Sequence, residues 1–124
     1  MSQRRHILYP CPCCGYIVFR EPPGSHDICP ICFWEDDESQ LRFADEGGGA
    51  NEVSLRQAQA NYAAAGVSED RLAARVRPPR QGEVRDPLWR PLDPERDEVE
   101  TAVGGVEYGG TYPSDLTDLY HWRR

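Results

Sequence analysis

The chain has 124 residues, 39% of them hydrophobic, and its 21 acidic and 14 basic residues give a formal net charge of −7. This size predicts one domain, or a small metal module with a helical extension, and excludes a large apolar core. The excess of acids disfavours nucleic acid as a partner, because phosphate backbones are bound by clustered Lys and Arg.

No apolar run reaches the roughly 20 residues that a membrane-spanning helix needs. The arginines near the N-terminus are not followed by a signal-type apolar stretch either. We therefore expect a cytoplasmic protein with no membrane partner. In that reducing compartment five cysteines favour a metal site over disulfides.

Two short runs at the start of the chain predict a β-ribbon. Residues 6–9 are mostly apolar, and residues 16–19 are β-branched and aromatic. Runs of this kind on either side of a tight turn are typical of paired antiparallel strands.

The turn between these runs carries the first of two Cys-x-x-Cys pairs. Each pair forms a tight knuckle, and the segment between the pairs allows both knuckles to face one tetrahedral metal ion. Proline follows the first cysteine of each pair, at Pro12 and Pro30, and Gly15 frees the backbone to turn away. The predicted ligands are Cys11, Cys14, Cys29 and Cys32.

A closed site with four thiolates indicates structural Zn²⁺, because it leaves no position for water or substrate. Iron is an alternative, since thiolate cages accept both metals. His26 could in principle replace a thiolate, but four cysteines already satisfy the metal. For the fifth cysteine, Cys13, we favour a buried side chain over a reactive thiol, because no His lies nearby in sequence.

Four consecutive acids, residues 35–38, follow the second knuckle, and Trp34 before them is expected to cover one side of the metal. The acids could bind a hard cation or an Arg-rich partner. We favour a turn whose carboxylates accept hydrogen bonds from backbone N–H groups or contact the Arg-rich segments.

The clearest helix begins after Ser54, which with Gln57 matches a capping box, and ends at Gly66. Asn51 is expected in a loop or cap, and Asn61 at an exposed helix position. A second short helix is expected to begin at residues 68–70 and to end before Pro78. The face predicted to pack on the ribbon contains Leu55, Ala58, Tyr62 and Ala65.

The C-terminal third of the sequence predicts secondary structure less clearly. Paired glycines around residues 104–110 suggest a hairpin, and Ser114 could cap a last helical turn. We expect Tyr120 and Trp122 to dock on the body; the alternative is an exposed patch that binds a partner.

Taken together, these elements predict a small α+β fold: a zinc-ribbon-like antiparallel module with two knuckles, one or two short helices, and a loop-rich extension. The expected boundaries are residues 1–45 for the ribbon, 46–80 for a helical part packed on it in the same domain, and 81–124 for the acidic extension.

Three separated blocks of this sequence resemble a known family. They are residues 9–16, residues 29–37, and a helical block with Asn51, Ser54-Leu55, Ala58 and Asn61-Tyr62. On these blocks the chain resembles the small bacterial cysteine-rich CPCC family over roughly residues 7–80. The resemblance implies a zinc-ribbon-like domain and assigns no catalytic residues.

The favoured hypothesis for function is a non-catalytic zinc-binding protein that acts through protein–protein contact, as an adaptor, regulator or immunity-type protein. Residues 93–118 hold eight acids and one Arg, and an acidic surface can cover the basic site of a partner. One alternative is a nucleic-acid-binding ribbon that uses Arg4, Arg5 and the basic residues of 71–80. Another is an enzyme, either a thiol oxidoreductase at Cys13 or a hydrolase using residues 35–38.

Overall fold

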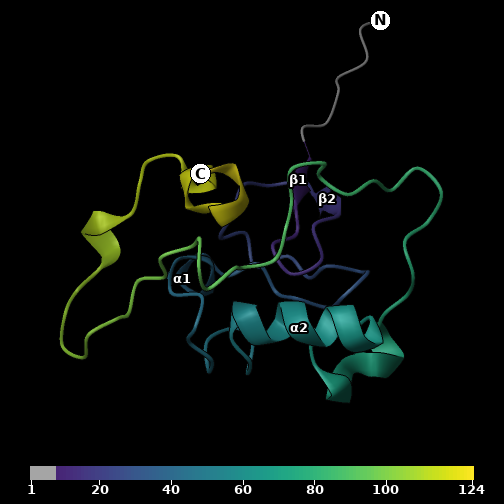
Figure 1. The fold of residues 1–124 in the computed structure, drawn as a ribbon, viewed down its shortest axis with the longest axis horizontal. Helices are drawn as coiled ribbons and strands as arrows, with labels where there is room; N and C mark the ends of the chain where they lie inside the picture. Colours follow the sequence, from purple (N-terminus) through teal and green to yellow (C-terminus); the bar gives the residue numbers. More distant parts are fainter. Residues whose placement is uncertain (1–7) are drawn as a thin grey trace, which may run out of the picture.

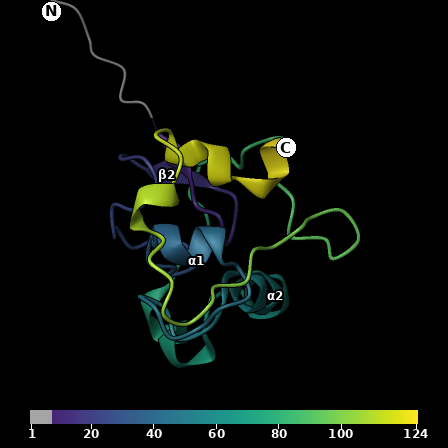
Figure 2. The same cartoon turned by 90° about the vertical axis from the view of Figure 1, so that its left-hand side faces the viewer.

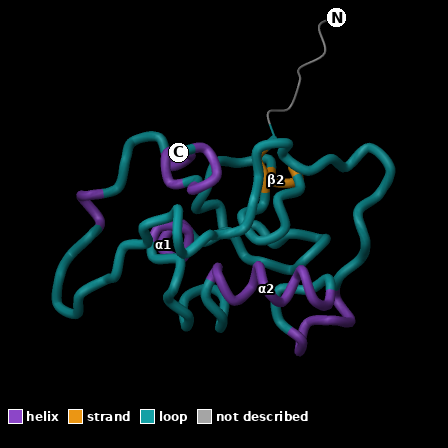
Figure 3. The backbone as a smooth tube through the Cα atoms, viewed as in Figure 1, coloured by secondary structure: helices purple, strands orange, loops and turns teal. Residues whose placement is uncertain are grey.

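The structure is a computed structural model in which residues 8–124 are described. Loops and turns, teal in Figure 3, make up most of the chain. Figures 1 and 2 agree on the arrangement: the two strands and the C-terminal helical turns lie on one side, α2 on the other, and α1 between them. The longest of the described helices, α2, has 11 residues, so none of them could span a membrane.

The predicted ribbon is present and short. Strand β1 covers Tyr9–Pro10 and β2 covers Ile17–Phe19, paired antiparallel with Tyr9 opposite Phe19. Residues 6 and 7 of the expected first strand lie outside the described residues. A later segment extends the ribbon, because the N–H of Ile17 donates to the carbonyl of Val84 at 2.9 Å. The fold is thus a small α+β fold of the zinc-ribbon type, as predicted.

The acidic run opens a helix that the sequence analysis did not predict, α1 at Glu38–Arg42. Asp37 caps it, because its Oδ1 accepts hydrogen bonds from the N–H groups of Ser39 and Gln40 at 2.8 and 3.4 Å. The preceding Asp36 is buried, and its Oδ2 accepts from the Ser25 hydroxyl at 2.8 Å. The expectation of carboxylates bonded to backbone N–H groups is confirmed for Asp37.

Helix α2 covers Leu55–Ala65, as the caps predict. The Ser54 hydroxyl accepts from the N–H of Gln57 at 3.1 Å, and Gly66 ends the helix with φ of 74°. The Gln57 amide donates to Asn61 Oδ1 at 2.8 Å, where a full capping box would point it back toward the start of the helix. On the predicted face Leu55 and Ala58 are buried and Tyr62 is partly buried, but Ala65 is exposed.

A short helix follows α2 as predicted, but the exposure of Asn61 and the cap of that helix differ from the predictions. Asn61 is partly buried, because its amide donates to the carbonyl of Ser68 at 2.8 Å and ties the helix to the next segment. The second helix is a 3-10 helix, η1 at Asp70–Arg75, and Glu69 precedes it with no side-chain cap. Ser68 is fully buried and its hydroxyl has no hydrogen-bond partner within residues 8–124, so the predicted cap is not formed.

The C-terminal third contains three 3-10 turns: η2 at Gly109–Thr111, η3 at Leu116–Leu119 and η4 at His121–Arg123. The hairpin expected over residues 104–110 is not formed, because a turn and η2 occupy that part of the described chain. Asp115 caps η3 in place of Ser114, accepting from the N–H of Thr117 at 3.0 Å.

The terminal aromatic residues dock on the body, as expected. Tyr120 and Trp122 are 1% and 5% exposed, and their rings stack with centroids 4.4 Å apart. Both belong to the same buried core as the cysteines of the knuckles. The alternative of an exposed aromatic patch at these two residues is therefore wrong.

Candidate metal centre

The two knuckles bring four sulfur atoms together in the core. The sulfurs of Cys11, Cys14, Cys29 and Cys32 all lie within 4.8 Å of one another. Cys11 Sγ is 3.6 Å from Cys32 Sγ, and Cys14 Sγ is 3.8 Å from Cys29 Sγ. In a tetrahedron with Zn–S distances of about 2.3 Å the sulfurs are about 3.8 Å apart. This arrangement could hold a metal ion.

Both knuckles have the same backbone hydrogen bonds. In the first, the Cys11 carbonyl accepts from the N–H of Gly15 at 2.7 Å, and the Cys11 N–H donates to Tyr16 at 2.8 Å. In the second, the Cys29 carbonyl accepts from Phe33 at 2.8 Å, and the Cys29 N–H donates to Trp34 at 2.9 Å. These two backbone hydrogen bonds hold each knuckle loop around its two cysteine sulfurs.

The residue after each pair has a positive φ, 82° at Gly15 and 70° at Phe33. Glycine adopts this conformation without cost, whereas a residue with a Cβ pays roughly 1–2 kcal/mol. Pro12 and Pro30, predicted to fix the second position of each knuckle, lie in the turns between the cysteines.

The site is shielded from solvent. All four cysteines are fully buried, and burial raises the pKa of the Cys11 and Cys32 thiols. Hydrogen bonds from the thiols of Cys11, Cys14 and Cys32 lower the pKa of Cys29. Four thiolates in so small a volume repel one another, so their full deprotonation requires a bound cation. The donor set of four sulfurs suits zinc or iron.

Neither of the two further candidates joins the cluster. Cys13 is fully buried, and burial raises the pKa of its thiol, as expected for a structural side chain. The ring of His26 is 55% exposed, and its Nδ1 lies 3.2 Å from Glu35 Oε2. The four-sulfur group is the metal-type cluster found within residues 8–124, and residues 35–38 add no second one.

Segments distant in sequence hold the first knuckle in place. The sequence analysis did not predict these contacts. The Pro12 carbonyl accepts from Gln59 Nε2 and from Trp89 Nε1, each at 3.0 Å. Arg85 Nε donates to the Cys14 carbonyl at 2.8 Å. The Trp89 indole also lies so close to Gly15 that a Cβ there would come within 2.5 Å of it.

A buried network of side-chain amides follows the second knuckle. The sequence analysis did not predict it either. Asn51 Oδ1 accepts from the N–H of Glu35 at 2.9 Å, and Asn51 Nδ2 donates to the Glu35 carbonyl at 2.9 Å. Gln40 Oε1 accepts from the backbone and the side chain of Asn51, both at 2.9 Å. Asn51 lies in a loop, as expected, and its side chain fixes that loop to the end of the ribbon.

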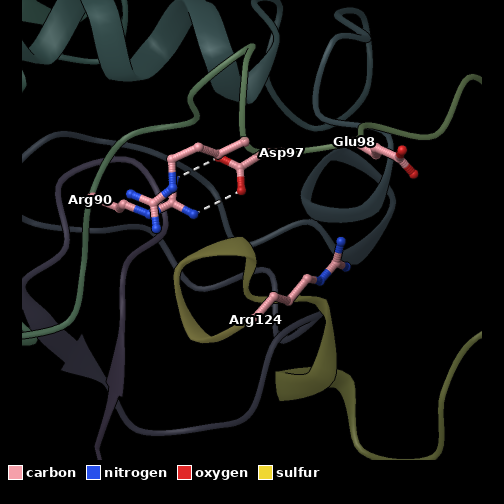
Figure 4. A pocket seen from close by; sticks show the side chains of 5 residues that line it. Arg90, Asp97, Glu98 and Arg124 are labelled. Atoms are coloured by element: carbon pink, nitrogen blue, oxygen red, sulfur yellow. Dashed lines mark hydrogen bonds and ion pairs between the residues drawn. The ribbon is translucent and has the colours of Figure 1, made fainter.

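A polar pocket of about 360 Å³ lies away from the knuckles (Figure 4). Arg90 donates to Asp97 through two nitrogens, at 2.6 and 2.8 Å, and this pairing lowers the pKa of Asp97. Figure 4 shows the Glu98 and Arg124 side chains apart from this pair. The pair closes the loop of residues 90–97.

A family model matches the greater part of the chain. The family model described as cysteine-rich CPCC matches residues 9–83, more than half of the chain. The matched range includes both knuckles, α1 and α2, and it ends just before the segment that packs on the first knuckle. No curated protein matches the chain. The chain belongs to the cysteine-rich CPCC family.

Proposed function

We propose that Cys11, Cys14, Cys29 and Cys32 hold one structural Zn²⁺ ion. The observation that carries this proposal is the spacing of the four buried sulfurs, all within 4.8 Å of one another. The two closest separations, 3.6 and 3.8 Å, suit tetrahedral ZnS₄ geometry, and a disulfide would need about 2.05 Å.

The ion would supply folding energy. The two-stranded ribbon is too short to be stable alone, because an isolated hairpin is marginal in water. A bound ion would cross-link the two knuckles, which are separated by residues 15–28, and would compensate the charge of the buried thiolates. With four protein ligands no coordination position is left for substrate, so the centre is non-catalytic.

The measurement that tests this proposal is metal content per chain by mass spectrometry on protein purified without added metal. We expect one zinc per chain, retained in Cys13→Ser and lost in Cys14→Ser. One iron per chain would identify the alternative metal. Protein that stays folded without any metal, or a metal that survives Cys14→Ser, would contradict the structural zinc site.

We further propose that the protein acts in the cytoplasm by contact with a basic protein partner, as an adaptor, regulator or immunity-type protein. Support comes from the charge of residues 93–118, which hold eight acids and one Arg. Among the exposed acids of this segment, Glu95, Glu98 and Asp118 form no ion pair with residues 8–124, whereas Glu100 pairs with Arg42 at 3.0 Å. They can attract a positively charged surface and set the orientation of its approach.

Nucleic-acid binding is the alternative, and two of the four arginines in its basic run already pair with acids. Of the basic run, Arg77 is bound to Glu83 at 2.6 Å and Arg71 to Glu69 at 3.0 Å. Arg4 and Arg5 lie outside the described residues. An enzyme is weaker still, since Cys13 is buried and Asp36 and Asp37 are occupied by hydrogen bonds.

Partner capture with matched charge variants separates these candidates. We expect tagged zinc-loaded protein to retain a basic protein from its native lysate. Retention should weaken in Glu95→Gln/Glu98→Gln and persist in Glu21→Gln/Asp27→Asn, which removes two exposed acids from the ribbon. Equal retention by both variants would contradict an acidic contact surface. Salt-dependent binding of short oligonucleotides would favour the alternative.

A further inference from the structure

A second pocket lies between α2 and the segment that packs on the first knuckle. Its volume is about 460 Å³, within the usual range for small-molecule sites. Its lining is mainly apolar and aromatic, with one guanidinium. The lining residues are Gln59, Tyr62, Ala63, Arg85, Trp89 and Pro91.

Arg85 is fixed in this pocket by its neighbours. Its backbone pairs with Tyr16 as an antiparallel bridge beside the ribbon. Its Nε donates to the Cys14 carbonyl at 2.8 Å, and its Cζ lies 4.9 Å from the ring centroids of both Tyr16 and Trp89. A guanidinium held in this way loses little conformational freedom when it binds an anion.

The two terminal nitrogens of Arg85 remain available. Within residues 8–124 its one hydrogen bond runs through Nε, and no carboxylate forms an ion pair with it. This differs from Arg77 and Arg90, whose terminal nitrogens both bind a carboxylate. The edge formed by the two terminal nitrogens matches a carboxylate in a bidentate arrangement.

Two other polar side chains of the pocket, Gln59 and Trp89, already have hydrogen-bond partners. Gln59 donates to the Pro12 carbonyl at 3.0 Å and accepts from the N–H of Leu92 at 2.8 Å. The Trp89 indole N–H also donates to Pro12, at 3.0 Å. A ligand would therefore place one anionic group at Arg85 and apolar surface against Tyr62, Ala63 and Pro91.

We propose that this pocket binds a small monocarboxylate carried on a flat apolar group, with the carboxylate on the terminal nitrogens of Arg85. The pocket offers a single guanidinium, and the chain has a net charge of −7. These charges favour a ligand with one negative charge over a doubly charged phosphate. The aromatic and proline walls suit a planar ring. This inference goes beyond the proposed zinc and protein-contact function and does not depend on it.

The test is a nuclear magnetic resonance titration of zinc-loaded, full-length protein with 2-naphthoate, following the Trp89 indole and Arg85 Nε resonances. For a ligand of this size we expect a dissociation constant of about 1 mM. The uncharged 2-naphthamide should bind at least tenfold more weakly. Perturbation of both resonances by naphthoate, and much less by the amide, supports a carboxylate site.

Three variants complete the test. Arg85→Gln should weaken naphthoate binding at least tenfold, whereas Arg80→Gln, an exposed arginine outside the pocket, should leave it within twofold. Ala63→Leu should block the pocket while keeping Arg85, and its exposed position on α2 tolerates the larger side chain without disturbing the fold. No perturbation up to 10 times the expected constant, or equal binding by Ala63→Leu and wild type, would overturn the proposal.

Discussion

Trp122 donates its indole N–H to Asp86 Oδ2 at 3.0 Å, and both residues are buried. The same oxygen accepts from Arg123 at 3.1 Å, while Oδ1 accepts from the N–H of Leu88 at 3.0 Å. Asp86 N–H donates in turn to the Gly15 carbonyl at 2.8 Å. Asp86 thus joins the end of the chain, through its carboxylate, to the first knuckle, through its backbone N–H.

Trp122→Phe should destabilise the protein by about 1.5–3 kcal/mol, because it removes a hydrogen bond to a buried charged group. Trp122→Ala should cost more, about 3–5 kcal/mol, because it also leaves a cavity. Denaturant unfolding of zinc-loaded protein measures both changes. A double-mutant cycle with Asp86→Asn should give a coupling energy of at least about 1 kcal/mol; additive effects would show that the bond contributes little.

Gly15→Ala should destabilise the protein by about 2–4 kcal/mol. The new Cβ would meet the Trp89 indole at 2.5 Å, and φ is 82°. Gly82→Ala is the matched control, because φ is 90° there and a Cβ would have nothing within 4 Å. Thermal unfolding of the two variants separates the contact with Trp89 from the backbone cost. Equal destabilisation would mean that the indole moves away freely.

Single replacements of the knuckle cysteines should abolish stoichiometric metal binding and unfold the ribbon. Buried Ser cannot provide the thiolate charge that the ion needs, and the remaining cysteines are too few for a closed site. Cys13→Ser should retain the metal and react no faster with a thiol reagent. Circular dichroism with added chelator provides the readout: wild type and Cys13→Ser should unfold, and retained structure in both would contradict a structural metal.

The ion pair between Arg77 and Glu83 should make stability depend on pH in the acidic range. The hydrogen bonds from Arg77, at 2.6 and 2.9 Å, with a further one from the N–H of Arg80, lower the pKa of Glu83 to about 2. The unfolded value is about 4.3. Since the folded pKa is the lower one, the stabilisation is present above about pH 4.3 and is lost as the pH falls toward 2.

Glu83→Gln isolates this contribution, because loss of metal in acid affects wild type and variant alike. The stability difference between the two should be largest near pH 6 and should shrink between pH 4.3 and 2. Unfolding by denaturant at a series of pH values measures it. A difference that does not change with pH would show that the ion pair contributes no linked stabilisation.

Features that depend on neighbouring residues could be predicted from the amino-acid sequence. The spacing of the two Cys-x-x-Cys pairs predicted the sulfur cluster, because a knuckle is a local turn. Ser54 and Gly66 predicted both ends of α2 for the same reason, since a cap acts within a few residues of the helix end. The ribbon strands followed from short β-branched runs beside the first knuckle.

Features that join distant segments became visible once the folded arrangement of the chain was known. Asp86 binds Trp122, Trp89 lies on Gly15, and Asn51 binds the backbone of Glu35. These contacts join residues that lie far apart in sequence, so a local pattern could not predict them. The Arg85 pocket depends on the same long-range packing. Local turn chemistry is encoded in adjacent residues, whereas the partner of a buried polar group depends on how the whole chain packs.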